Sequence, residues 1–216
     1  MKLLIITNYN HKASKKLIKY LKLKNFNFDH IDSSKKKKIK ISKNYDYLIS
    51  FLNSRYIDST VRKKIKLGSF NFHPGPPDYP GFGCYNFALL DKVNFYGSTL
   101  HVINDKFDNG KIINVKKFKI SYKRIDLNKL IIMTHRNITK QAKDFIDLVR
   151  GGRLKIKSNL KWKRKAYSRE EFENARKIKL TDTKSNVLKK IKAFTYKDYE
   201  SVYINFKGLK FEFKKY

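Results

Sequence analysis

The sequence has few cysteines and no long apolar run. It contains a single cysteine, Cys84, so no disulfide can form within the chain and no cysteine cluster can hold a metal. The opening MKLLIITNYN has about five consecutive apolar residues, whereas a signal peptide needs a longer stretch and a membrane helix needs roughly 20. We therefore expect a cytoplasmic protein that does not insert into membranes.

Acidic residues and arginines are also scarce. The chain has 18 acidic and 51 basic residues, for a formal net charge of +33, and nine of the basic residues are arginine. Such a charge is typical of nucleic-acid-binding proteins, but these usually rely on arginine, whereas here lysines are spread along the chain. We interpret the charge as a solvated lysine-rich surface, which would attract anions such as nucleotide diphosphates or folates.

Short apolar runs alternate with segments of helical spacing. Strands are predicted over residues 2–7, 26–31, 47–51, 69–73, 96–103 and 112–120, and helices over 13–23, 58–67, 84–91 and 126–149. The lysine-rich residues 33–40 are expected to form an exposed loop. The alternation predicts an α/β fold with a Rossmann-like, mostly parallel sheet flanked by helices.

The C-terminal part has a different pattern. Residues 162–167 read as extended and basic, 169–177 and 186–194 as short helices, and 202–206 and 209–213 as a β-hairpin. We expect a main domain over residues 1–180 and a C-terminal helix and hairpin over 181–216. Because an isolated hairpin is marginal in water, we expect residues 200–216 to form a homodimer interface, or else to fold back onto the same domain.

One strand end carries two polar side chains. In SFNFHPGPPDYPG, residues 69–81, alternation places Asn71 and His73 on one side of the strand and Phe70 and Phe72 on the other. Ligands of open α/β sheets bind beyond the carboxyl ends of strands, and the stiff proline loop that follows suits a substrate wall. The residues alone leave two alternatives, a reactive site or two side chains that anchor the loop.

A second stretch, YGSTLHVINDKFDNGKII at residues 96–113, contains a strand that breaks into Asp108-Asn109-Gly110. Asp-Asn-Gly is a turn signal by itself. Together, however, the two stretches contain Asn71-Phe72-His73-Pro74, then Gly97-Ser98-Thr99-Leu100-His101, and an aspartate seven residues after that histidine. This pattern resembles the catalytic domain of the folate-dependent formyltransferases, over roughly residues 45–115.

The resemblance implies an enzyme with Asn71, His73 and Asp108 as catalytic residues. In this family an amine attacks the formyl carbon of N10-formyltetrahydrofolate, and an oxyanion forms. Asn71, and His73 as imidazolium, would donate to that oxygen, and Asp108 would raise the pKa of His73 and relay protons. His101 is expected to brace the aspartate loop, and no metal is expected.

The resemblance also implies binding residues. The folate site would include Arg55, Tyr56 and Ile57 together with the loop residues Asn104, Phe107 and Asp108. For Tyr56 and Ile57 the alternative is ordinary core packing. The proline loop would provide substrate contacts from Pro76, Tyr79 and Gly81.

The amino-acid sequence of the proline loop indicates which class of amine is formylated. Pro74 to Asn86 looks like the nucleotide-sugar N-formyltransferases, which act on aminodeoxysugars linked to dTDP, GDP or UDP in the synthesis of surface polysaccharides such as lipopolysaccharide O-antigen. Methionyl-tRNA formyltransferase, another formyltransferase, or a basic nucleic-acid-binding module on the same scaffold are the alternatives. Because 70 residues precede Asn71, fewer than is usual in this family, the first βαβ region is expected to be shortened.

Overall fold

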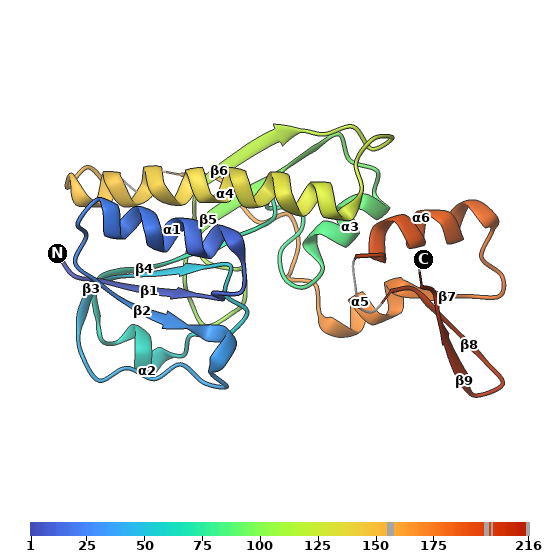
Figure 1. Cartoon of the computed structure of the whole chain (residues 1–216), viewed down its shortest axis with the longest axis horizontal. Helices are drawn as coiled ribbons and strands as arrows, with labels where there is room; N and C mark the ends of the chain where they lie inside the picture. The colour runs from blue at the N-terminus through green and yellow to red at the C-terminus, as the bar shows by residue number, and fades with distance from the viewer. Residues whose placement is uncertain (155–157, 197–198, 200, 215–216) are drawn as a thin grey trace.

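The computed structural model describes residues 1–154, 158–196, 199 and 201–214, and a six-stranded sheet forms its centre (Figure 1). The strands are β1 (Leu3–Thr7), β2 (Phe28–Asp32), β3 (Tyr45–Phe51), β4 (Ile65–His73), β5 (Phe95–Val102) and β6 (Ile112–Lys119). Their order is β2-β1-β3-β4-β5-β6, with the first three pairings parallel and the last two antiparallel. The predicted mostly parallel sheet is confirmed.

Two long helices, α1 (Lys12–Leu23) and α4 (Leu127–Arg150), cover one face of the sheet (Figure 1). The Asp126 carboxylate accepts the backbone N–H of Lys129 and so caps the start of α4. From α4, the ring of Phe145 lies edge-on to Phe70 and Phe72 of β4, at 5.0 and 5.8 Å between centroids. Phe70 and Phe72 thus face α4, so the polar residues of β4 lie on the opposite side of the strand.

The connections on the other face of the sheet are short. They contain a 3-10 helix, η1 (Ser33–Lys35), and a four-residue helix, α2 (Ser59–Arg62). The expectation of an exposed loop over residues 33–40 is only partly right, because Ser33 and Ile39 are buried. Ile39 packs with Ile57 and Val61 under the sheet. The expected shortening of the first βαβ region stays a prediction, since β1 and β2 are joined by the complete helix α1.

The helix predicted over residues 58–67 is wrong beyond its first turn. Asp58 does cap α2 by accepting the N–H groups of Thr60 and Val61, but β4 already begins at Ile65. Ile65 pairs with Tyr45 of β3 in the sheet. Sheet pairing, which depends on distant residues, therefore prevails over the local helical spacing.

The C-terminal part adds a small three-stranded sheet beside the main one (Figure 1). Its elements are α5 (Arg169–Arg176), β7 (Lys177–Ile178), α6 (Lys184–Phe194), β8 (Tyr203–Phe206) and β9 (Leu209–Glu212). Its helix α6 packs against α3 (Cys84–Leu90), which lies between β4 and β5 in the chain. The β8–β9 hairpin is confirmed, and β7, which the sequence did not indicate, pairs with β8. The predicted boundary at residue 180 would separate β7 from β8 and β9, with which it forms one sheet. The division into two domains stays a prediction.

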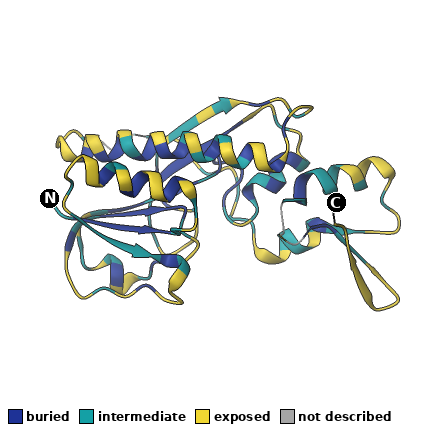
Figure 2. Cartoon of the chain, in the orientation of Figure 1, coloured by how far each residue is buried: buried dark blue, intermediate teal, exposed yellow. Residues whose placement is uncertain are grey.

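A buried arginine joins the parts of this C-terminal unit. The Arg176 guanidinium donates to Glu173 at 2.8 Å and to the Ser201 carbonyl oxygen at 2.5 Å, and it also reaches Glu212 of β9. The distal half of the hairpin, by contrast, is exposed (Figure 2). The hairpin is therefore fixed at its base and free of the rest of the chain at its tip.

The contact of Phe145 with β4 gives a test of the fold. Phe145→Ala should lower the free energy of unfolding by about 3–5 kcal/mol, because it removes a buried ring and leaves a cavity behind β4. Leu148→Ala on the exposed side of the same helix should change it by less than about 0.5 kcal/mol. Urea denaturation of both variants measures the difference, and equal effects would contradict the assigned core face.

Candidate active site

The polar side of β4 ends at the candidate active site. Asn71 and His73 lie on the side of the strand opposite Phe70 and Phe72, as the alternation predicts, and so face away from α4. His73 is buried, with 3% of its surface exposed, and Asn71 is half-buried. The two side chains are thus presented together beyond the end of a central strand.

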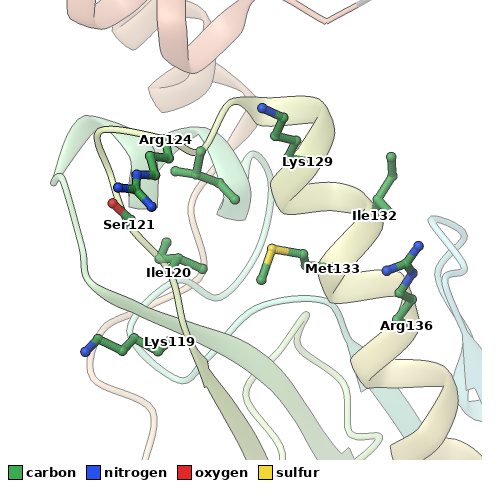
Figure 3. Close-up of a pocket in the computed structure, with 9 residues that line it drawn as sticks. Lys119, Ile120, Ser121, Arg124, Lys129, Ile132, Met133 and Arg136 are labelled. Carbon is green, nitrogen blue, oxygen red and sulfur yellow. The ribbon is translucent and has the colours of Figure 1, made fainter.

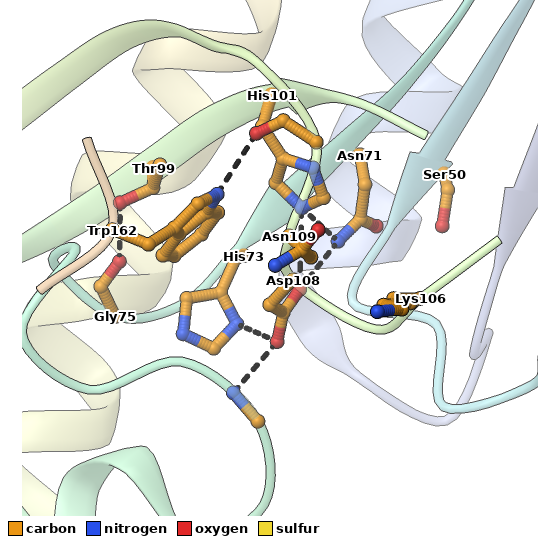
Figure 4. A network of polar contacts seen from close by, with 12 residues as sticks. Ser50, Asn71, His73, Gly75, Thr99, His101, Lys106, Asp108, Asn109 and Trp162 are labelled. Carbon is orange, nitrogen blue, oxygen red and sulfur yellow. Dashed lines mark hydrogen bonds and ion pairs between the residues drawn. The ribbon is translucent and has the colours of Figure 1, made fainter. Parts of the chain in front are cut away.

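Asp108 meets both side chains from the loop after β5 (Figure 4). One carboxylate oxygen, Oδ2, lies 3.0 Å from His73 Nδ1 and accepts the Gly81 backbone N–H at 2.8 Å. The other, Oδ1, lies 3.2 Å from His101 Nε2 and 3.4 Å from the Asn71 amide nitrogen. The structure therefore brings together the three residues that the resemblance nominates for catalysis.

His73 and Asp108 form a buried ion pair. Burial by itself lowers the pKa of His73, but the adjacent carboxylate charge and its hydrogen bond prevail and raise the pKa above its ordinary value. For the Asp108 carboxyl, burial acts in the opposite direction and raises the pKa. The His73 charge and the hydrogen bonds from both histidines outweigh burial and hold the pKa of Asp108 well below its ordinary value. Because His73 Nε2 lies 2.8 Å from the Tyr79 carbonyl oxygen, both ring nitrogens face acceptors, which suits the imidazolium.

His101 braces the aspartate loop, in the position that the sequence analysis expected for it. Its Nδ1 donates to the Val102 carbonyl oxygen at 2.8 Å, and its Nε2 contacts Asp108 and the Asn71 amide. This fixes the ring plane with Nε2 toward the carboxylate. Of the remaining histidines, His11 and His135 pack edge-on against each other, and His30 contacts Thr7.

The proline loop is held by hydrogen bonds and leaves little side chain free. Tyr79 is buried, and its hydroxyl donates to Asp91 at 2.8 Å. Pro76 is buried as well, and Gly81 uses its N–H on Asp108. Substrate contacts by Pro76, Tyr79 and Gly81 stay a prediction. For Tyr79, the hydroxyl is directed to Asp91, so its backbone carbonyl and not its side chain lies beside His73.

The residues expected to bind folate divide into two groups. Tyr56 and Phe107 are exposed, their rings lie 5.4 Å apart, and the Tyr56 hydroxyl donates to the Asp105 carbonyl oxygen. Phe107 belongs to the loop that carries Asp108, and Tyr56 contacts this loop from the segment after β3. Ile57, by contrast, is buried in the core, which is the alternative left open for it.

Two further residues complete that set. Arg55 is exposed, and its Nε donates to the Ser33 carbonyl oxygen at 3.4 Å. Asn104 stabilises the start of the aspartate loop, since its side-chain oxygen accepts the Lys106 backbone N–H at 3.1 Å. Folate binding by all these residues stays a prediction.

Trp162 is a site residue that the sequence analysis did not identify. Its ring lies edge-on to both His73 and His101, and its indole N–H donates to the Gly110 carbonyl oxygen (Figure 4). The available signal was that it is the single tryptophan of the chain, in a segment otherwise basic. Nothing local to residues 162–167 indicates that they return to the end of β4.

A pocket of about 580 Å³ lies elsewhere, between the end of β6 and the first half of α4 (Figure 3). Its lining comprises Lys119, Ile120, Ser121, Arg124, Ile125, Lys129, Ile132, Met133 and Arg136. Because Asn71 and His73 face away from α4, this pocket is separate from the candidate active site. Among the described residues, no helix is long and apolar enough to cross a membrane, and no cluster of His, Cys, Asp or Glu is arranged to hold a metal ion.

Comparison with known proteins identifies the family. Residues 9–136 match the formyl transferase family, and this region is more than half of the chain and contains Asn71, His73 and Asp108. The protein therefore belongs to the formyl transferase family, as the two motifs predict.

Individual relatives are more distant. The bifunctional polymyxin resistance protein ArnA of Wigglesworthia glossinidia brevipalpis is 34% identical over 79 residues, which are 36% of this chain and 12% of that much longer protein. A sugar N-formyltransferase from a Shewanella species is similar in structure, with a TM-score of 0.80 and 20% identity over 100% of this chain and 97% of that one.

A second solved structure shares the fold at similar distance. It is the N-formyltransferase of Helicobacter canadensis in complex with folinic acid and dTDP-3-aminofucose, with a TM-score of 0.71 and 18% identity over 96% of this chain and 84% of that one. Both neighbours confirm the formyltransferase fold.

The ion pair predicts a pH dependence of stability. The charged form of His73 stabilises the fold fully below its ordinary pKa of 6.5, and this contribution is lost as the pH rises through the raised pKa of the folded state. The charged form of Asp108 stabilises the fold fully above its ordinary pKa of 3.8, and this contribution is lost as the pH falls through the lowered pKa of the folded state. The pair therefore contributes fully between these values. The stability difference between wild type and Asp108→Asn should be larger at about pH 5.5 than at about pH 9.

The control is Asp144→Asn, which removes a half-exposed carboxylate beside Lys116. This variant should differ little from wild type at both pH values, because exposed ion pairs contribute about 0–1 kcal/mol. Denaturant titrations measure all three proteins. An Asp108→Asn difference that is the same at both pH values would contradict the buried ion pair.

Proposed function

We propose that this protein transfers a formyl group from N10-formyltetrahydrofolate to the amine of a nucleotide-linked aminodeoxysugar. The observation that carries the proposal is the convergence of Asn71, His73 and Asp108 beyond the end of β4 in a chain of the formyl transferase family. The choice of acceptor is supported by the Pro-Gly loop at residues 74–83 and by the two structural neighbours, which are described as a sugar N-formyltransferase and as a complex with dTDP-3-aminofucose.

Asn71 is the proposed donor to the oxygen on which charge develops. Its amide is half-buried, and the hydrogen bond to Asp108 is long at 3.4 Å, so the N–H is easily redirected. An amide donates without changing its charge, and one such donor typically contributes about 10²–10³ in rate. His73 Nε2 would serve as a second donor once it leaves the Tyr79 carbonyl oxygen.

Asp108 is the proposed proton acceptor for the substrate amine. All four lone-pair directions of its carboxylate are used, and the contact of Oδ1 with Asn71 is the longest of the four. An amine that approaches from the side of Asn71 therefore displaces the weakest contact. Because the pKa of Asp108 is held low by His73, the carboxylate does not retain the proton. The proton passes to N10 of the departing tetrahydrofolate as the bond between N10 and the formyl carbon breaks.

The surroundings of the aspartate loop fit a folate. N10-formyltetrahydrofolate supplies the formyl group when it is bound. The exposed rings of Tyr56 and Phe107 offer flat apolar surface beside Asp108, and Arg55 adds a cation suited to an anionic ligand. We therefore keep these three residues, with Asn104, as the proposed folate contacts.

The setting of the reaction follows from the acceptor. Surface-polysaccharide precursors such as those of lipopolysaccharide O-antigen carry nucleotide-linked aminosugars, so we propose that the enzyme acts on them in the cytoplasm, with dTDP as the first carrier to examine. The net charge of +33 would attract the diphosphate.

The decisive experiment incubates the protein with N10-formyltetrahydrofolate and a panel of aminodeoxysugars linked to dTDP, GDP or UDP. A mass gain of one formyl group on one of them, unaffected by added RNA, is the expected result. If no sugar is formylated and the protein instead binds tRNA with a steep salt dependence, the nucleic-acid alternative replaces this proposal.

Single substitutions test the three site residues. Asn71→Ala, His73→Ala and Asp108→Ala should each lower kcat by about 10²-fold or more, because each removes a group that acts on developing charge or on the proton. Asp108→Asn keeps the shape and removes the charge, so it should be equally slow. Full activity in two of the alanine variants, or in Asp108→Asn, would contradict the assigned roles.

We also propose a homodimer through residues 200–216, of which 200, 215 and 216 lie outside the described residues. In the hairpin, Ile204 pairs with Phe211 and Phe206 with Leu209, so these four side chains share one face. Phe206, Leu209 and Phe211 are 49–64% exposed in the single chain. The alternative of a hairpin folded back onto its own domain would bury this face, and here it is bare.

Sedimentation equilibrium tests the dimer at physiological salt, where screening over about 8 Å weakens the repulsion between basic subunits. Deletion of residues 200–216 or Phe211→Ser should give monomers, because both remove the apolar face. Lys210→Ser, which changes the opposite face, should leave the dimer intact. A wild-type monomer at micromolar concentration would rule the interface out.

A further inference from the structure

The indole of Trp162 walls one side of the candidate active site. Its ring centroid lies 5.9 Å from that of His73 and 5.1 Å from that of His101, with both imidazoles nearly perpendicular to it (Figure 4). Trp162 comes from the segment between α4 and α5, which is far in sequence from β4 and β5. On this side the indole covers the two imidazole rings that hold Asp108.

The same indole holds the loop that carries Asp108. Its N–H donates to the Gly110 carbonyl oxygen at 2.8 Å, two residues beyond the aspartate. Asp108 has a left-handed backbone with φ of 40°, which is strained for a residue with a side chain. A side chain at Gly110 would collide with the Val102 carbonyl oxygen, so the loop is pressed onto the end of β5 while Trp162 fixes it from outside.

Residues 162–167 also hold the proline loop. The Lys163 N–H donates to the Pro77 carbonyl oxygen at 3.0 Å, and the Tyr167 N–H donates to that of Pro80 at 2.9 Å. Between these two points lies Tyr79, whose carbonyl oxygen contacts His73 Nε2. One segment thus fixes both loops that provide partners to the His73–Asp108 pair.

We propose that Trp162 is a positioning residue for formyl transfer. It fixes the Asp108 carboxylate against His73 and keeps water from one side of the pair, so that the charge and the direction of Asp108 are set before a substrate arrives. This inference rests on the proposed function for its catalytic consequence, and on geometry alone for its effect on His73.

The kinetic test separates the ring from its hydrogen bond. Trp162→Phe keeps an aromatic wall and removes the N–H, and should lower kcat about tenfold. Trp162→Leu removes both and should lower it about 10²-fold, with KM for the aminosugar within about threefold. Lys161→Ala, an exposed neighbour, is the control and should match wild type. Wild-type kcat in both Trp162 variants would overturn the proposal.

A second measurement needs no substrate. The chain has five histidines, so NMR titration can follow His73 individually. In Trp162→Leu the pKa of His73 should move toward the ordinary 6.5, because Asp108 is no longer held beside it, and Trp162→Phe should show a smaller shift in the same direction. Folded variants in which His73 titrates as in wild type would refute the positioning role, even if the wild type formylates no sugar in the panel.

Discussion

The buried ion pair between His73 and Asp108 constrains the rest of the site. A charge removed from water is costly unless it is paired and its remaining hydrogen-bonding positions are filled. The Asp108 carboxylate meets this condition through His73, His101, Asn71 and the Gly81 N–H. Since these partners come from β4, β5 and the proline loop, one carboxylate requires three segments to converge. Removal of either charge would leave the other without compensation in the protein interior.

Backbone shape makes this convergence possible. Gly81 has φ of 86°, and a side chain there would collide with the backbone of Tyr167, so only glycine brings this N–H to Asp108. Asp108 itself adopts a left-handed conformation without that freedom, and its loop is held by contacts with β5 and Trp162. The site therefore concentrates strained backbone where several partners over-determine it, which is how such strain persists in folded proteins.

The sequence predicted the parts of this arrangement that depend on local periodicity. Alternation along β4 was enough to place Asn71 and His73 on one face, and strand–helix alternation was enough for the sheet. The meeting of Asp108 with these residues followed from the family resemblance, because a DNG turn alone does not show where it packs. Long-range pairing could not be foreseen: it converts residues 65–67 from helix to strand, adds β7 beside the hairpin, and returns Trp162 to the two histidines.

Charged residues have two separate roles in this chain: the few carboxylates mostly stabilise the fold and the site, and the many lysines set the field at the surface. Several of the 18 carboxylates have structural partners: Asp58 and Asp126 cap helices, Asp91 accepts the Tyr79 hydroxyl, and Asp108 pairs with His73. Most lysines are left to the surface, where their field attracts anions and is screened by salt over about 8 Å. The buried pair is shielded from that screening by the protein around it. Salt should therefore weaken the encounter with an anionic substrate while it leaves the charge of Asp108 unchanged, which separates attraction to the site from chemistry within it.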